Sequence, residues 1–153
     1  MATNNIVNLQ TKSSWTSFTT TITATTTNPT PGTGVTKSSY YLQMGKILFV
    51  KFFFNENAGG ADGSGVYLFN IPTGFTINTT VAPISNNQST FGNCTCLNNL
   101  ASGFGAVVIG DSTHYMLIAY ASTTTQANYV SNTWYGMSFS PSMYCVSAQL
   151  PIL

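Results

Sequence analysis

The chain has 153 residues, of which 43% are hydrophobic and 5% are charged, and its formal net charge is +1. This length suffices for one domain with its own core, and the hydrophobic content excludes a disordered chain. Four scattered lysines and no arginine argue against a nucleic-acid partner, because phosphate contacts need clustered basic side chains. No segment reaches the roughly 18 consecutive apolar residues of a membrane span, and the N-terminus shows no signal-peptide pattern.

The low charge also bears on association. An ordinary soluble protein carries roughly 25% charged residues. Here Thr, Asn, Ser and Gly supply the polar surface, so copies of the chain repel one another only weakly. We therefore expect a component of an assembly, with a neutral secreted domain as the alternative.

The sequence of residues 1–34 predicts an arm, then a strand, then a loop. Residues 1–14 are polar apart from a short apolar run, and we expect them to form an N-terminal arm or an edge strand ahead of a single domain over residues 15–153. The segment 15–27 is rich in threonine, which favours strand over helix. Its apolar residues do not keep one parity, so a bulge or bend is expected near Trp15. A loop rich in proline and glycine follows at residues 28–34.

The stretch from Lys46 to Asn55 is β-branched and aromatic, which predicts a strand. Alternate residues of a strand share a face. One face carries Leu48, Val50, Phe52 and Phe54; the other carries Ile47, Phe49, Lys51 and Phe53. A strand with one solvated face should alternate apolar and polar residues, and this strand does not. We therefore predict that the second face contacts another layer or another copy of the chain, through Ile47, Phe49, Lys51 and Phe53.

The rest of the chain predicts further short strands and no helix. The expected strands are Val66–Ile71, Phe104–Ile109, Tyr115–Tyr120, Trp134–Ser140 and Tyr144–Leu150. Between them lie a glycine-rich loop at residues 57–65, a polar segment at 86–102, a turn at Asp111–Ser112 and a polar connection at 121–132. Residues 75–84 leave room for another short strand. Strands at this spacing predict an all-β fold, an antiparallel β-sandwich of the jelly-roll type.

Four motifs occur in a recognisable order. Trp15 opens a Trp-x-x-Phe, residues 41–50 form Tyr-x-x-x-Gly-Lys-x-x-x-Val, residues 65–74 form Gly-x-Tyr-x-Phe-x-x-Pro-x-Gly, and residues 134–140 form Trp-x-x-x-x-Phe-Ser. In this order the chain resembles the jelly-roll domains of structural proteins from tailed phages and large DNA viruses, in tail-fibre heads, baseplates and capsid decorations. It is distantly similar to the trimeric C1q and tumour-necrosis-factor jelly rolls. The motif residues serve packing and turns, so the likeness is one of architecture.

This resemblance implies a non-enzymatic virion protein that forms a homotrimer or a subunit of a larger shell. Its partners would be other copies and other virion proteins, with no cofactor. The alternative is a receptor- or glycan-binding tip of a viral fibre. Tyr129, Trp134 and Tyr135 are then candidates for stacking on sugars, with burial of the same rings as the competing interpretation.

The sequence shows no convincing catalytic or metal-binding set. His114 lies close to Asp111 and Ser112, but no Gly-x-Ser-x-Gly elbow accompanies them. The loop near Glu56 and Asp62 offers oxygen ligands for Ca²⁺, yet its spacing fits no EF-hand, and a solvated loop is the favoured interpretation.

The three cysteines, Cys94, Cys96 and Cys145, are an odd number. Free thiols are therefore the favoured expectation, although either of the first two could reach Cys145 if the fold brought them together.

Overall fold

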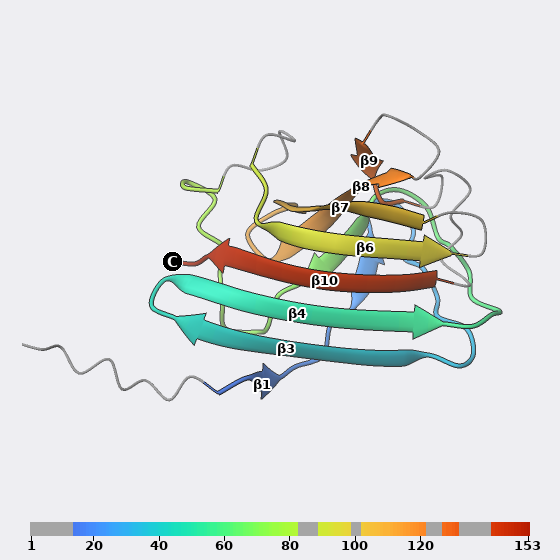
Figure 1. Ribbon diagram of the computed structural model, residues 1–153, viewed down its shortest axis with the longest axis horizontal. Coiled ribbons are helices and arrows are strands. Elements are labelled where there is room, and N and C mark those ends of the chain that lie inside the picture. The colour runs from blue at the N-terminus through green and yellow to red at the C-terminus, as the bar shows by residue number, and fades with distance from the viewer. Residues whose placement is uncertain (1–13, 83–88, 99–101, 122–126, 132–141) are drawn as a thin grey trace, which may run out of the picture.

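A computed structural model describes residues 14–82, 89–98, 102–121, 127–131 and 142–153. Within these ranges the chain forms strands and no helix (Figure 1). The strands are β1 (Thr16–Ser17), β2 (Ile22–Ala24), β3 (Thr36–Met44), β4 (Ile47–Glu56), β5 (Tyr67–Asn70), β6 (Gly92–Asn98), β7 (Ser102–Ile109), β8 (His114–Ala121), β9 (Ala127–Tyr129) and β10 (Ser142–Pro151). The expected strand 134–140 and residues 1–13 of the expected arm lie outside the described residues.

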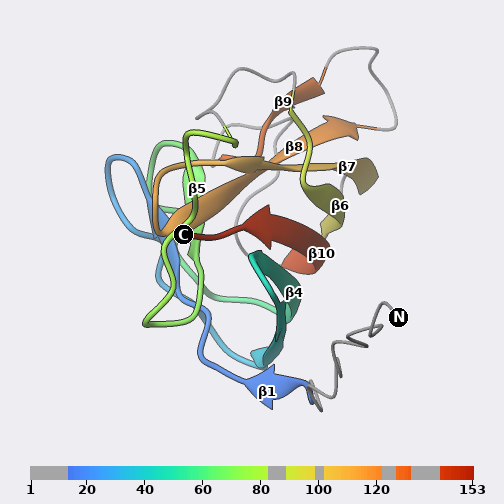
Figure 2. The same ribbon diagram turned by 90° about the vertical axis from the view of Figure 1, so that its left-hand side faces the viewer.

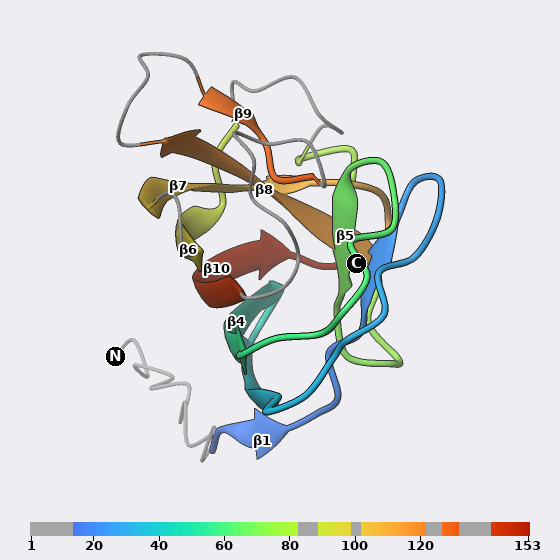
Figure 3. The ribbon, with the colours of Figure 1, turned by 90° about the vertical axis from the view of Figure 1, so that its right-hand side faces the viewer.

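The ten strands form one antiparallel sheet in the order β1-β3-β4-β10-β6-β7-β8-β5-β2, with β9 beside β8. The sheet curls into a half-barrel, so β5 lies across the core from β4 and β10 (Figures 2 and 3). The expected all-β antiparallel class is confirmed. In place of two separately hydrogen-bonded sheets, the structure has a single sheet that bends round its own core.

The predicted strand from Lys46 is confirmed as β4, and its alternation is confirmed as well. Leu48, Val50, Phe52 and Phe54 are all buried on the concave side of the sheet. There the Phe52 ring lies 5.7 Å from that of Phe69 on β5, and Phe69 lies 5.8 Å from Tyr144 on β10. These contacts hold the two sides of the half-barrel together. Burying one such aromatic side chain stabilises the folded chain by about 1.5–3 kcal/mol.

Two strands that flank β4 set the position of its other face. β10 pairs with β4 along its whole length, from Ser142 opposite Glu56 to Pro151 opposite Ile47. β3 pairs with the other edge through a two-residue turn, Gly45–Lys46, in which Gly45 has a φ of 60°. Glycine adopts this left-handed conformation without steric cost, so the hairpin can reverse within two residues.

The expected strand at residues 15–27 is wrong in one respect. The structure contains two very short strands there, and they lie at opposite edges of the sheet, β1 against β3 and β2 against β5. The Phe18 N–H still donates to the Ser39 carbonyl (3.1 Å), and the Thr21 N–H donates to Asn70 Oδ1 (2.6 Å). This segment therefore ties the two edges of the half-barrel together.

Three other strands were not expected from the sequence. β3 lies between the expected loop at residues 28–34 and the strand predicted from Lys46, β6 lies within the polar segment at 86–102, and β9 lies within the connection 121–132. In the short-strand region 75–84, the described part forms a single bridge, Ile77 with Ile152.

Candidate association surface

The side of the sheet that faces away from the core is called the outer face here. The four residues predicted to make contacts all lie on it. Ile47 and Lys51 are exposed, and Phe49 and Phe53 are half-buried, between buried neighbours along the strand. In the single chain this face meets solvent. Whether another copy covers it stays a prediction.

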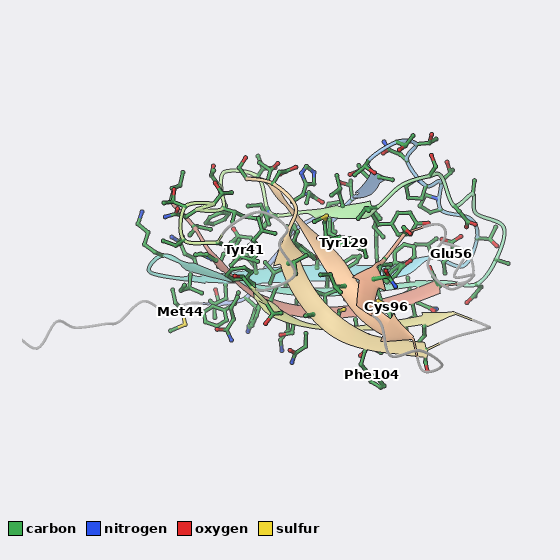
Figure 4. All side chains as sticks on the ribbon, turned by 90° about the horizontal axis from the view of Figure 1, so that it is seen from above. Tyr41, Met44, Glu56, Cys96, Phe104 and Tyr129 are labelled. Atoms are coloured by element: carbon green, nitrogen blue, oxygen red, sulfur yellow. The ribbon has the colours of Figure 1, made fainter. Side chains whose placement is uncertain are left out.

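The outer face carries most of the exposed apolar bulk of the described chain. Seven large hydrophobic side chains are exposed there or nearby, and five project from this face: Trp15, Tyr40, Met44, Ile47 and Phe104. Met44 and Phe104 point to the same side of the sheet (Figure 4). Phe104 is the most exposed of them, at 72%. Exposed apolar side chains gathered on one face of a soluble protein are typical of an interaction site.

A hollow of about 490 Å³ lies in the middle of this face, across β3, β4, β10 and β6. Its outward side chains form two adjacent cross-strand rows: Ser38, Phe53, Cys145 and Thr95 in one, and Tyr40, Lys51, Ser147 and Asn93 in the other. The hollow exists because small side chains occupy β10 and β6 while larger ones stand on β4 and at Tyr40. The Lys51 ammonium lies 5.2 Å from the Trp15 ring, a cation–π contact that restrains it at one rim.

The apolar surface continues past the β3–β4 hairpin. A second hollow, of about 500 Å³, is lined by Ile47, Val81, Pro151 and Leu153 among others. Val81 and Leu153 are both more than half exposed. The apolar band therefore runs from the centre of the sheet to its end.

The charges near this face are all positive. Lys46 and Lys51 lie on or beside it. The carboxylates lie elsewhere: Glu56 is buried, Asp62 belongs to the loop after β4, and Asp111 belongs to the β7–β8 turn. The face thus offers apolar contact and hydroxyl groups but no acidic side chain among the described residues.

The histidine and its neighbours form a structural turn. Asp111 Oδ1 accepts the N–H groups of Thr113 (2.6 Å) and His114 (2.8 Å), and Oδ2 lies 2.9 Å from His114 Nδ1. Burial acts to raise the pKa of Asp111, but the hydrogen bonds from Thr113 and His114 outweigh it and leave this pKa below its usual value. His114 Nδ1 also lies 3.0 Å from the Thr113 hydroxyl, so the contacts of this ring belong to the turn itself.

The buried carboxylate joins two loops. Glu56 is 1% exposed, and its Oε1 accepts the Gly32 N–H at 2.7 Å, which fastens the loop at residues 28–34 beside the loop at 57–65. Its Oε2 has no hydrogen-bond partner within the part of the chain that the structure describes. Among the described residues no three His, Cys, Asp or Glu side chains gather in a metal-binding group.

The cysteines are divided between the two faces. Cys94 and Cys96 are buried on the core side of β6, whereas Cys145 is half-buried on the outer face, and all three are free. A disulfide to Cys145 would have to pass through the sheet. A hydrogen bond with Cys94 and burial raise the pKa of Cys96, and burial raises that of Cys145, so neither has the lowered pKa of a reactive thiol.

Of the three residues expected to stack on sugars, the structure describes one. Tyr129 is half-buried and packs against Val108, Met116 and Ile118. Trp134 and Tyr135 lie outside the described residues. Tyr129 alone therefore supports packing more than a stacking platform.

Comparison with protein-family models, with curated proteins and with solved structures finds no match to this chain. The viral jelly-roll resemblance therefore stays a prediction. In the part of the chain that the structure describes, no helix is long and apolar enough to span a membrane.

Sequence reasoning found the β4 residues of this surface but missed Trp15, Tyr40, Met44 and Phe104. A signal for the last was available, because Phe104 stands between Gly103 and Gly105 within an otherwise apolar strand. Two glycines that leave room on the core side around one aromatic residue indicate that the ring points outward.

Proposed function

We propose that this chain is a non-enzymatic structural subunit of a virus particle that associates with other copies of itself through the outer face. The observation that carries the proposal is the concentration of exposed apolar side chains on one face, which carries no acidic side chain among the described residues. Apolar burial is the main favourable term in most protein association, and weak charge removes the opposing repulsion.

The setting of this assembly comes from the sequence. The resemblance to viral jelly rolls supports a virion location, other virion proteins as further partners, and three chains as the first expectation for a self-assembled unit. The curled antiparallel sheet is compatible with a jelly-roll lineage. The non-enzymatic part rests on the lack of an acid, base and nucleophile set in the sequence.

A glycan- or receptor-binding tip is the second candidate. The hollow favours it, because Tyr40 and Lys51 line the same hollow as the hydroxyl and amide groups of Ser38, Thr95 and Asn93. Aromatic faces and hydroxyl groups are what a sugar needs. Binding to a glycan array by a chain that stays monomeric would favour this candidate over self-association.

The test is the native mass of the purified chain by light scattering over a range of concentrations. The variant Phe49→Glu places a charge at a half-buried position of the outer face, and we expect it to abolish association while the chain still folds. Thr73→Glu, at an exposed turn away from this face, adds the same charge and should leave association unchanged. A wild-type chain that stays monomeric throughout, or a folded Phe49→Glu that still associates, would contradict the proposal.

A further inference from the structure

One cross-strand row on the outer face joins a protruding ring to a hollow. Phe104 on β7 lies beside Thr95 on β6, Thr95 beside Cys145 on β10, and Cys145 beside Phe53 on β4. Phe104 stands clear of the surface, whereas Thr95, Cys145 and Phe53 line the hollow. The chain thus presents a knob and a hole side by side on the outer face.

The spacing of this row has a symmetry consequence. Neighbouring strands lie about 4.8 Å apart, so Phe104 and Phe53 are separated by three strand spacings, roughly 14 Å. The midpoint of the row falls between Thr95 and Cys145. Consider a second sheet that faces the first. A two-fold axis that runs parallel to the strands, between the two sheets and above that midpoint, places the knob of each copy over the hole of the other.

We propose that two copies pack outer face to outer face about this axis, with each Phe104 ring seated in the partner's hollow over Phe53 and Lys51. This inference rests on the proposed function and names the contact by which association occurs. The interface is isologous, because the same patch is used twice and each knob fills the other copy's hole.

Packing and charge both fit this arrangement. The side chains closest to the axis, those of Thr95 and Cys145, are small, which lets the two sheets approach each other. The inserted ring meets an apolar surface at Phe53 and a cation at Lys51, a favourable partner for an aromatic face. The two Lys51 side chains lie on opposite sides of the axis, roughly 14 Å apart in the plane of the sheet and beyond the screening length of about 8 Å at physiological salt.

A ring of three chains would need a different surface. In a cyclic trimer the knob and its hole must face different neighbours, whereas here both lie on the same face within three strand spacings. Two chains that meet through this face bury both features at once and leave neither for a third. The geometry therefore predicts two chains for the unit formed by this contact, where the resemblance alone suggests three.

The decisive variant is Phe104→Ala. Because the ring is 72% exposed, its removal should leave the fold intact. We expect sedimentation velocity to give a wild-type species of two chains, and the variant to weaken that dimer at least tenfold, as loss of a central aromatic does. Met44→Ala, also more than half exposed on this face but away from the hollow, is the matched control and should change the affinity less than threefold.

A second measurement tests whether the two copies meet near Cys145. Cys145 is the thiol of the described chain on the outer face and lies next to the axis, whereas Cys94 and Cys96 are buried. A short bis-maleimide should therefore link two chains through Cys145, and Cys145→Ser should abolish the product.

Each other outcome would overturn the inference. Association that persists in Phe104→Ala, or a species of three chains without a Cys145 cross-link, would reject this contact but leave self-association standing. A wild-type chain that is monomeric at every concentration would reject both, and binding of a saccharide probe by that monomer would assign the hollow to the glycan candidate.

Discussion

Glu56 ends β4 with its carboxylate buried at 1% exposure, in a chain that has very few charges. In the described part of the chain no cation pairs with it, and its one hydrogen bond accepts the Gly32 N–H. A buried charge without a partner is costly, whereas a buried acceptor that satisfies a backbone N–H is useful. The stabilising role of this residue should therefore lie in its oxygen and not in its charge.

We expect Glu56→Gln to match or exceed the stability of the wild type, by up to about 1 kcal/mol, because the amide oxygen can still accept from Gly32. Glu56→Ala should lose about 1–3 kcal/mol, because the Gly32 N–H then lacks its partner and the two loops lose their link. Urea unfolding at neutral pH measures both. If Gln proves as damaging as Ala, the charge itself is required, and a bound cation becomes the explanation to test.

The hairpin between β3 and β4 shows how a turn positions the candidate surface. It places Met44 opposite Ile47 and Tyr40 opposite Lys51, which aligns the apolar band across two strands. Gly45 makes the reversal at a φ of 60°, and a Cβ added there would meet nothing within 4 Å. Any cost of substitution at this site therefore comes from the backbone conformation.

Gly45→Val should destabilise the chain by about 1–2 kcal/mol, since a β-branched residue is a steric outlier at positive φ. Gly45→Asn is the matched variant, because asparagine tolerates the left-handed region, and it should cost only a few tenths of that amount. Thermal unfolding followed by circular dichroism compares the two. Equal melting temperatures for Val and Asn would show that the turn is not held in this conformation.

Whether a strand could be predicted from the sequence depends on whether its pattern lies within the strand itself. β4 could be predicted with its face assignment, because ten consecutive residues carry the alternation. β3 was missed because the polar Ser39 occupies its buried position and breaks the apolar alternation. β6 was missed because polar asparagine and threonine residues flank the buried Cys94 and Cys96. β1 and β2 were merged, because each is only two or three residues long and is defined by its partner in a distant part of the chain.

The candidate surface, too, was predictable only where it depends on a single strand. Ile47, Phe49, Lys51 and Phe53 follow from parity within one strand, so the sequence alone placed them on one face. The hollow and its neighbour Phe104 depend on the register of four strand pairs, with partners up to about a hundred residues apart in sequence. No local pattern specifies that register, so a knob beside a hole is visible only in the folded chain.

At the scale of the whole molecule, two features bear on association: the chain itself joins the two edges of the half-barrel, and it carries few charges. The segment between β1 and β2 joins the two sheet edges, so the outer face is held as one curved surface. Few charges are available anywhere on the chain, and those on the outer face are lysines. Association through this face must therefore draw on apolar burial.

If association draws on apolar burial, its response to salt can be predicted. Screening weakens contacts between charges, with a Debye length of about 10 Å at 0.1 M and about 3 Å at 1 M, but it does not weaken apolar burial. We expect the dimer affinity to change less than threefold between 0.05 and 0.5 M sodium chloride, and to rise in sodium sulfate, which strengthens apolar burial. Sedimentation velocity on the wild type measures both series. A tenfold loss in sodium chloride would mean that Lys46 or Lys51 meets an acidic group across the interface, and the contact would then have to involve the Asp62 or Asp111 region of the neighbouring copy.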